Sequence, residues 1–536
     1  MAARTNEPSA LPQEVATLIG QRHVIVASNR GPVEFIRGAG GRLTTRRGAG
    51  GVVTALAMLA HDLPMTWVAA TMSEADREAF PAGSAAAREV RLGRQPLRVR
   101  YVNVPPEMYT RYYDVVSNEL LWFLQHYMWD PATTPTFTEQ HYTAWDQGYR
   151  PVNFAIAQAI ADEALAATRQ LPRRGARSTD GSDTIVLLQD YHLYLTAARV
   201  RERLPRASIQ QFIHIPWPTM RYWQFLPERF VLEIFEGLAA NDVLGFQTEE
   251  DARNFLECAR CFLPDIRIDL DQGRLIRRRH RLLARAYPVA VDAAEIMHTA
   301  NSAAGRTGAR ELGRLLDDDA QVIVRVDRLE PTKNIVRGFQ AYEALLHHHP
   351  ELHGHVRHLA FLVPSRQELD RYRRYDRDVR RIIHRINAEF GTPDWQPITA
   401  FFENNRARAL AAMRRYDVLL VNPVIDGMNL VVKEGPVINE RDGVVVLSRT
   451  AGAFQQMRRA VLPVTPTDIE ETREQLYEAL HMSAHERQER ARLAHEIATS
   501  RTPAAWVLDQ LSAAAAIRAA APKGARAMAG ALPRAG

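Results

Sequence analysis

The sequence predicts an α/β protein with two doubly wound, Rossmann-like domains that face each other across a deep cleft. At 536 residues the chain is too long for one hydrophobic core, which indicates two or three domains. Short apolar runs that end in polar residues alternate with helical segments, as in the βαβ units of parallel sheets. Because these runs fall into two successive series, we expect two such sheets.

The composition narrows the class of protein. Hydrophobic residues make up 46% of the chain and charged residues 24%, as in globular proteins. The 68 basic and 62 acidic residues give a net charge of +6, and no dense basic block is interleaved with aromatics, so we expect no nucleic-acid partner. No apolar run could span a bilayer and no secretory signal opens the chain, so we expect a cytoplasmic protein without a membrane partner.

The two cysteines, Cys258 and Cys261, form one Cys-Ala-Arg-Cys pair in a segment with a helical pattern. One such pair cannot supply the four ligands of a structural zinc site. We therefore interpret both as reduced structural thiols and expect no metal.

The first predicted domain covers residues 21–292, after a flexible tail at 1–20. It opens with a buried strand at 23–27 and a polar turn. The glycine-rich segment that follows contains Gly50 and Gly51 and leads into a helix. Strand, glycine loop and helix can bring backbone N–H groups close to a ligand oxygen, although a plain tight turn would have the same pattern.

Two later strands of this domain end in residues that can take part in chemistry. The run 184–189 leads to Asp190, and the run 209–213 leads to His214. The carboxyl ends of parallel strands share the edge where ligands bind, so we expect these side chains at one crevice. The aromatic segment 109–130 can either pack the core or stack on sugar rings. The remaining strands of this domain are predicted at 65–69, 244–248 and 285–292.

The second predicted domain covers residues 293–483. A C-terminal helix at 484–515 is expected to pack back toward the first domain, and the alanine-rich residues 516–536 are expected to be disordered. The strands of this domain are predicted at 321–328, 359–364, around 401, 418–423 and 444–448.

The stretch from Asp426 to Pro436 follows the buried strand at 418–423 and begins a helix. Its carboxylate, glycine and amide side chains stand where the helix should expose unpaired N–H groups, which suits an anionic ligand. Glu434 lies about two turns further on, where it can accept hydrogen bonds from a sugar diol. A strand, polar loop and helix without a ligand would have the same pattern.

Eight motifs, collinear from about residue 23 to about residue 500, resemble the trehalose-6-phosphate synthases of glycosyltransferase family 20. They are Ser28-Asn29-Arg30, Gly50-Gly51, Asp190-Tyr191-His192, His214-Ile215-Pro216, Leu244 to Thr248, Tyr287-Pro288, Arg328 with Lys333, and Asp426 to Val431 with Lys433 and Glu434. That family contains retaining enzymes with the two-Rossmann GT-B fold. The resemblance implies transfer of glucose from a nucleotide diphosphate glucose to glucose 6-phosphate, giving α,α-trehalose 6-phosphate without a metal or other cofactor. The resemblance is also compatible with assembly of the chain into a homodimer or homotetramer.

The resemblance also implies roles for individual residues. Arg328 and Lys333 would neutralise the departing diphosphate, His214 would contact the donor sugar, and Asp190 would orient the acceptor sugar. Residues that match the family's donor-binding positions are Gly50, Gly51, Asp426, Gly427, Met428, Asn429, Leu430, Val431 and Glu434. Residues that match its acceptor-binding positions are Arg30, Tyr113, Trp122, Asp190 and Arg366.

Several positions depart from the commonest family pattern. The loop that usually has the sequence Arg-Leu-Asp-Tyr-Ser-Lys-Gly is here Arg328 to Asn334, Arg-Leu-Glu-Pro-Thr-Lys-Asn, and Gln189 stands where a histidine is usual. These variants resemble an actinobacterial branch that includes GDP-glucose-using synthases. The segment 401–405, at the expected base pocket, also differs, and its asparagines can pair with the edge of guanine. UDP-glucose and ADP-glucose stay open as donors.

Three rival functions also stay open. The same branch holds a pseudo-glycosyltransferase that joins two cyclitols through nitrogen, and glucosylglycerol-phosphate synthase differs in its acceptor. This sequence keeps the Ser28 motif, the Gly50-Gly51 pair and the Asp426 motif, which we expect the pseudo-enzyme to have altered, so true sugar transfer is favoured. A catalytically silent sugar-phosphate sensor would be expected to lack Arg328, Lys333 or Glu434, and all three are present.

Overall fold

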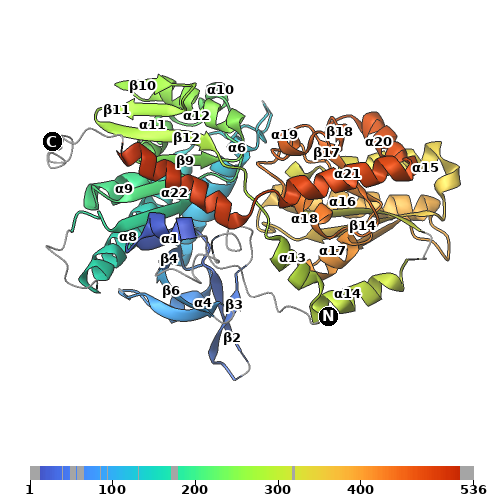
Figure 1. Cartoon of the computed structure of the whole chain (residues 1–536), viewed down its shortest axis with the longest axis horizontal. Coiled ribbons are helices and arrows are strands. Elements are labelled where there is room, and N and C mark those ends of the chain that lie inside the picture. Colours follow the sequence, from blue (N-terminus) through green and yellow to red (C-terminus); the bar gives the residue numbers. More distant parts are fainter. Residues whose placement is uncertain are drawn as a thin grey trace. The chain divides into compact units, whose positions relative to one another are not determined.

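The computed structural model describes residues 13–38, 40–48, 56, 65–84, 86–92, 95–130, 132–170, 179–316 and 320–519. The chain forms two compact units, each built around its own sheet (Figure 1). The first unit runs to Pro288 and takes in the chain again from Pro503, and the second unit is Val289–Thr502.

In the described part of the chain, ten strands form the sheet of the first unit, in the order β10-β11-β12-β9-β8-β7-β1-β4-β6-β5. Strands β12 through β6 in that order run parallel, and β10, β11 and β5 pair antiparallel at the edges. Later strands extend the sheet from β1 in one direction and from β7 in the other, so the direction reverses between β1 and β7. Open α/β sheets bind ligands at such a switch point. The strands are β1 (His23–Ser28), β4 (Met65–Ala70), β5 (Arg88–Leu92), β6 (Gln95–Val102), β7 (Thr184–Gln189), β8 (Ser208–Phe212), β9 (Val243–Phe246), β10 (Ile266–Asp269), β11 (Arg274–Arg277) and β12 (His280–Ala286), with a separate hairpin of β2 (Val33–Arg37) and β3 (Leu43–Arg47).

The central strands of this sheet are covered on both faces. Every residue of β4, β7, β8 and β9 is buried, as expected for parallel strands with helices on each side. The helices that we name in this unit are α1 (Gln13–Ile19), α4 (Glu74–Ala79), α5 (Pro106–Thr110), the π-helix η1 (Arg111–Trp122), α6 (Phe123–Gln125), α7 (Glu139–Ala144), the π-helix η2 (Trp145–Tyr149), α8 (Arg150–Gln170), the 3-10 turn η3 (Tyr191–Leu193), α9 (Thr196–Arg203), α10 (Met220–Trp223), α11 (Glu228–Leu238), α12 (Glu249–Phe262) and α22 (Pro503–Ala519).

The sheet of the second unit is entirely parallel, in the order β15-β14-β13-β16-β17-β18. This is the Rossmann order 3-2-1-4-5-6, with its switch point between β13 and β16. The strands are β13 (Gln321–Arg328), β14 (Val356–Val363), β15 (Ile398–Phe401), β16 (Val418–Val421), β17 (Val444–Ser448) and β18 (Leu462–Val464). The helices are α13 (Ala293–Ala300), α14 (Ala303–Gly313), the 3-10 turn η4 (Pro331–Lys333), α15 (Ile335–His348), the 3-10 turn η5 (Pro350–Leu352), α16 (Asp370–Phe390), α17 (Arg406–Met413), α18 (Val431–Ile438), α19 (Phe454–Met457), α20 (Ile469–His481) and α21 (Ala484–Thr499).

The predicted fold of two doubly wound Rossmann-like domains is confirmed, and the cleft between them stays a prediction. The structure differs at the ends of the predicted domains. Residues 13–19, which we assigned to the tail, form α1, because Val15 and Ile19 are spaced to bury one helical face. Helix α21, which we assigned to the returning C-terminal segment, belongs to the second unit, where it packs against α18.

The returning segment is α22, which packs against α1, β8, β9 and β12 (Figure 1). We expected disorder from residue 516, but α22 continues to Ala519. Ile517 is buried there, and the Arg518 guanidinium donates to the carbonyl oxygens of Ala207 and Arg206 at 2.8 and 2.6 Å. Alanine is a strong helix former, so an alanine-rich composition does not by itself indicate disorder.

Within the described ranges, no helix is both long enough and apolar enough to cross a membrane. The predicted cytoplasmic location stays a prediction. The predicted cysteine-bearing helix is α12, where Cys258 is buried, Cys261 is exposed and both thiols are free. Burial raises the pKa of the Cys258 thiol to about 12, as expected for a structural residue.

Candidate active site

Arg30 follows β1 at the switch point of the first unit. The turn that carries it is held by Ser28, whose hydroxyl donates to the Arg30 carbonyl at 2.5 Å and accepts from Trp67 Nε1 at 2.8 Å. The Arg30 side chain hydrogen-bonds to that of Tyr113. The structure therefore brings together two residues that the resemblance assigns to the acceptor phosphate.

Tyr113 is positioned by a column of aromatic rings. Its ring stacks between Tyr109, at a centroid distance of 5.3 Å, and His192, at 5.7 Å. The Tyr109 hydroxyl accepts from Asn29 Nδ2 at 3.2 Å, which connects this column to the turn after β1. Trp122, from the same π-helix η1, is only 2% exposed and stacks on His126 at 3.9 Å, so its observed contacts are those of a packing residue.

Asp190 lies directly after β7, on the other side of this switch point. Its backbone has φ +70° and ψ 178°, a region that is occupied essentially only by glycine. Its carboxylate accepts from the His214 backbone N–H at 3.2 Å, and its carbonyl oxygen accepts from Gln211 Nε2 at 3.1 Å. A strained aspartate at a sheet edge is typical of a functional residue, because the strain persists only where the surroundings hold it.

The His214 side chain is held by two glutamines. Its Nε2 lies 3.0 Å from Gln189 Oε1, and its Nδ1 lies 3.5 Å from Gln247 Nε2. Burial lowers the pKa of His214 to about 3, so the ring is neutral at pH 7. An Nε2–H that donates to Gln189 leaves Nδ1 as an acceptor. Gln189, one of the positions that depart from the family pattern, is thus in direct contact with a predicted site residue.

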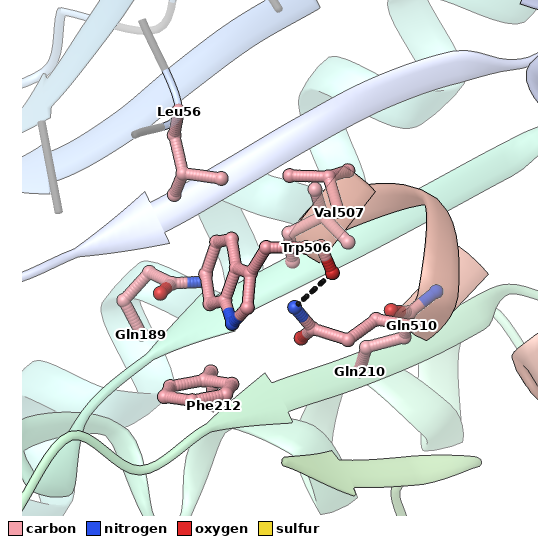
Figure 2. Close-up of a pocket in the computed structure, with 8 residues that line it drawn as sticks. Leu56, Gln189, Gln210, Phe212, Trp506, Val507 and Gln510 are labelled. Atoms are coloured by element: carbon pink, nitrogen blue, oxygen red, sulfur yellow. Dashed lines mark hydrogen bonds between the residues drawn. The ribbon is translucent and has the colours of Figure 1, made fainter. Parts of the chain in front are cut away.

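A small pocket lies beside Gln189, under the C-terminal helix α22 (Figure 2). Trp506 and Gln510 of α22 face Gln189, Gln210 and Phe212 of the sheet across it. Gln510 Nε2 donates to the Trp506 carbonyl at 3.0 Å. The Gln210 side chain is 2% exposed, and its amide makes no hydrogen bond to any described residue, so the pocket has a polar wall.

The switch point of the second unit is rich in charge. The Arg328 guanidinium lies 2.8 Å from Glu330 Oε1, and the Arg366 guanidinium lies 3.0 Å from Glu330 Oε2. The Glu330 side chain is 1% exposed, and Arg366 also donates to the Tyr372 hydroxyl at 2.8 Å. One buried carboxylate thus holds a predicted diphosphate-binding arginine and a predicted acceptor-binding arginine.

Lys333 ends the turn after β13 and forms an ion pair with Asp426, which follows β16. Burial alone would lower the pKa of Lys333, but Asp426 and Glu330 together raise it above its ordinary value, so the amine is charged. The next residue, Asn334, has φ +58° in the left-handed region. Asparagine tolerates that conformation, which explains how it replaces the glycine usual at this position.

The loop after Asp426 opens the helix α18. Asn429 has φ +67°, and its Nδ2 donates to Asp426 Oδ2 at 3.2 Å. Gly427 and Met428 are buried in this loop, and Leu430 is the N-cap residue, with no side-chain cap. The first-turn N–H groups, beginning at Val431, are therefore a suitable site for an anion.

Glu434, on α18, pairs with Arg406 at the start of α17. Arg406 Nη2 lies 3.2 Å from Glu434 Oε1, and Arg406 Nη1 lies 2.7 and 2.8 Å from the two carboxylate oxygens of Glu295. Burial raises the pKa of Glu434, and the Arg406 charge opposes that rise. The preceding residue of the helix, Lys433, donates to the Val289 carbonyl at 2.8 Å.

Each unit therefore gathers most of its predicted site residues at its own switch point. In the first unit these are Arg30, Tyr113, Asp190 and His214, and in the second unit they are Arg328, Lys333, Arg366, Asp426, Gly427, Met428, Asn429, Leu430, Val431 and Glu434. Gly50 and Gly51 lie outside the described residues. The roles assigned to all of these residues stay predictions.

Sequence reasoning missed Glu330 and Arg406, which contact predicted site residues, and Glu295, which pairs with Arg406. Glu330 was noted only as a departure in its loop, and Glu295 and Arg406 were not noted at all. Glu330 could have been found from its place at a strand end, two residues after Arg328. Arg406 could have been found as the first residue of a helix capped by Asn405.

Comparison with known proteins places nearly all of the chain in one family. A family model described as Glycosyltransferase family 20 matches residues 22–516. A bifunctional trehalose-6-phosphate synthase/phosphatase of Thermoproteus tenax is 31% identical over 497 residues. The match covers 91% of this chain but 62% of that relative, so the chain spans less than two thirds of its length.

Two further relatives are similar over nearly their full length. A validamine 7-phosphate valienyltransferase of Streptomyces hygroscopicus subsp. jinggangensis is 30% identical over 473 residues, which cover 88% of this chain and 90% of that protein. The crystal structure of an alpha,alpha-trehalose-phosphate synthase (UDP-forming) from Burkholderia xenovorans, in complex with glucose-6-phosphate, has a TM-score of 0.73 and 26% identity. It covers 92% of this chain and 100% of the solved one. These findings confirm the predicted resemblance.

Proposed function

Because the chain belongs to glycosyltransferase family 20, we propose that it moves glucose from a nucleotide diphosphate glucose to glucose 6-phosphate, giving α,α-trehalose 6-phosphate with retention. One observation carries the proposal most strongly. Arg328, Lys333 and the first turn of α18 converge on the switch point between β13 and β16, where a Rossmann sheet binds a nucleotide. Two cations and a helix N-terminus suit a diphosphate.

On the donor side, the diphosphate would lie against Arg328, Lys333 and the amides from Asn429 to Val431. Glu434 would accept hydrogen bonds from the ribose hydroxyls, and Asp426 would bind hydroxyls of the transferred glucose. The contact between Glu434 and Arg406 supports this assignment, because it joins the ribose position to the segment that precedes α17.

On the acceptor side, Arg30 and Tyr113 would grip the phosphate of glucose 6-phosphate, together with Arg366. Asp190 would orient the acceptor sugar, and the neutral His214 would contact the donor sugar. The hydrogen bond between Arg30 and Tyr113 supports this assignment, since it directs two phosphate-binding groups to one place. The Burkholderia xenovorans relative has glucose-6-phosphate bound, which supports the class of acceptor.

The chemistry follows from the charges. The acceptor hydroxyl would attack the anomeric carbon from the face that the diphosphate leaves, and a donor phosphate oxygen would take the acceptor proton. Negative charge on the diphosphate is greatest in the transition state, so Arg328 and Lys333 would stabilise that state more than the bound substrate. No metal is needed in this scheme, and we expect full activity in the presence of a chelator.

We propose GDP-glucose as the preferred donor, with UDP-glucose and ADP-glucose as alternatives. The segment 401–405 before α17 supports this choice, because its asparagine amides can both donate to and accept from the edge of guanine. The Asn405 side chain already accepts from the Arg408 backbone N–H at 3.1 Å as the helix cap. Asn404 is therefore the better candidate for contact with the base.

The direct test is to incubate the purified protein with glucose 6-phosphate and GDP-, UDP- or ADP-glucose in turn, with and without a chelator, and to identify products by mass spectrometry. Trehalose 6-phosphate from GDP-glucose at the highest kcat/KM is the expected result. The absence of product from every donor would contradict the proposal.

One alternative function has its own support, because the valienyltransferase relative is named for coupling a cyclitol rather than a sugar. Adding a cyclitol phosphate acceptor and a nucleotide-linked cyclitol to the same assay separates the two reactions. Glycerol 3-phosphate as an acceptor tests the glucosylglycerol-phosphate synthase alternative. A silent sensor would bind glucose 6-phosphate and form no product with any pair of substrates.

A further inference from the structure

Arg325 is an arginine in the interior of β13, the strand that ends at Arg328. Its side chain is 0% exposed, in a strand whose other central residues are Val322, Ile323 and Val324. A guanidinium so deeply buried is costly unless its donors are all paired. Asp327 supplies the opposite charge, with its Oδ2 at 3.1 Å from Arg325 Nε and 2.9 Å from Nη2.

The remaining donors of Arg325 hold the turn that carries Lys333. Arg325 Nη2 donates to the Lys333 carbonyl at 3.2 Å, and Nη1 lies 3.4 Å from the Ile335 carbonyl. Between these two residues Asn334 has its left-handed conformation. The guanidinium thus grips the backbone on both sides of the residue that redirects the chain.

The same guanidinium reaches the other side of the switch point. Arg325 Nη2 lies 3.3 Å from Asn422 Oδ1, in the residue that follows β16 and precedes Asp426 by four. The Asn422 carbonyl accepts from Asn334 Nδ2 at 3.0 Å, which closes the link between the two turns. One buried side chain therefore connects the segments that carry Lys333 and Asp426.

A glycine provides the room for this arrangement. A Cβ on Gly338, in α15, would lie 2.3 Å from Arg325 Nη1 and 3.1 Å from Asn422 Oδ1. Because no real Cβ approaches another atom so closely, an alanine at this position must displace the guanidinium. Gly338 is thus a place where the arrangement can be disturbed without removing a charge.

We propose that Arg325 is a positioning residue, which fixes the Lys333 backbone so that its amine is held against Asp426 and the donor diphosphate. This inference rests on the proposed function. Electrostatic catalysis requires that the charge be placed before the reaction, and a displacement of about 1 Å can reduce a rate about 100-fold. A lysine has four rotatable bonds, so its placement depends on a well-held backbone as well as on Asp426.

The test compares Arg325→Lys and Gly338→Ala with a matched control, Arg487→Lys. Arg487 also binds a buried aspartate, Asp417 at 3.0 Å, and a backbone carbonyl, that of Arg441 at 2.9 Å, and within the described residues its hydrogen bonds reach none of the site residues. We expect kcat to fall about 10- to 100-fold in both test variants, with the KM for glucose 6-phosphate unchanged. We expect Arg487→Lys to lower the melting temperature about as much as the two test variants do, but to keep the wild-type kcat.

Binding of free GDP and UDP, measured by calorimetry, provides a readout that does not depend on the reaction. We expect weaker binding in Arg325→Lys and Gly338→Ala and unchanged binding in Arg487→Lys. If the wild-type protein forms no trehalose 6-phosphate, this measurement still decides the positioning role and separates it from the proposed function. The proposal would be overturned if the test variants kept the wild-type kcat and nucleotide affinity, or if Arg487→Lys lost as much kcat and affinity as they do. Failure of both test variants to fold would also overturn it.

Discussion

The two switch points of this molecule are built from different interactions. In the first unit, stacked aromatic rings position Tyr113, and two glutamine side chains hold a neutral His214. In the second unit, the predicted donor-binding cations each contact a carboxylate: Arg328 pairs with Glu330, and Lys333 pairs with Asp426. We call the first unit the packed half, because packing shapes its site, and the second unit the ionic half, because its site is a network of ion pairs.

This difference indicates how each half should respond to its ligand. An anion that binds in the second unit competes with Glu330 and Asp426 for the same cations. A doubly charged anion is therefore favoured over a singly charged one. Arg30 in the first unit faces the Tyr113 hydroxyl instead, which an acceptor phosphate can join rather than displace. We therefore expect the ion pairs of the second unit to rearrange when a ligand binds, and the aromatic site of the first unit to change little.

The largest expected effect removes a charge from the ionic half. Lys333→Ala should lower kcat by about two to three orders of magnitude, because it deletes a cation that acts on the departing diphosphate. Glucose 6-phosphate should still bind, since its predicted contacts Arg30, Tyr113, Asp190 and Arg366 are all kept. Steady-state kinetics and calorimetry check both statements, and a near-normal kcat would contradict the role of Lys333.

The next prediction concerns the strained residue of the packed half. Asp190→Gly should reduce kcat/KM about 100-fold, because the carboxylate that orients the acceptor is lost. It should also be more stable than Asp190→Asn by about 1–2 kcal/mol, since glycine adopts φ +70° without strain. Urea denaturation of the two variants measures this difference, and equal stabilities would show that Asp190 is not strained.

A third variant tests whether Glu330 and the ligand compete for the same arginines. Glu330→Gln removes the charge that Arg328 and Arg366 share, so the affinity for free GDP or UDP should rise several-fold. Because a buried ion pair is broken, stability should fall by about 3 kcal/mol. Calorimetry and thermal denaturation give the two values. Weaker nucleotide binding in a folded variant would mean that Glu330 assists the cations instead of competing with the ligand.

The smallest prediction concerns pH and belongs to the packed half. The folded protein holds His214 neutral with a pKa of about 3, whereas the unfolded chain protonates it near 6.5. The unfolded state therefore binds more protons between these values, and stability falls as the pH drops below 6.5. In His214→Gln, the free energy of unfolding should depend less steeply on pH, by about 1.4 kcal/mol per pH unit near pH 5. Parallel stability curves for the two proteins would contradict the buried, neutral assignment.

Much of this arrangement could be predicted because it is local in sequence. A run of apolar residues that ends in a polar loop locates a strand and its ligand edge at once, which is how Asp426 was found, whereas Lys333 was found through the family resemblance. The Arg-rich edge strands β10 and β11 were missed, since their exposed positions interrupt the apolar signal. Strand β18 was missed because three residues are too short for a period to be recognised.

The contacts that tune the site could not be predicted, because they join residues far apart in the chain. Glu330 and Arg366 are 36 positions apart and meet only once β13 and β14 pair. Asparagine tolerates the left-handed conformation of Asn334 and Asn429, but tertiary contacts decide which asparagines adopt it. Sequence reasoning thus found which charges face the ligand edge, but it did not find which carboxylates already hold them.

Helix α22 has a consequence for the way the protein is made. Its Trp506 donates to the Tyr287 carbonyl at 2.8 Å, and its Arg518 lies 3.3 Å from the buried Asp242, so it completes the first unit. The ribosome produces this helix only after the whole second unit has been synthesised. A nascent chain that has left the ribosome only as far as Thr502 would therefore have all the residues of the second unit but a first unit whose sheet lacks the cover of α22.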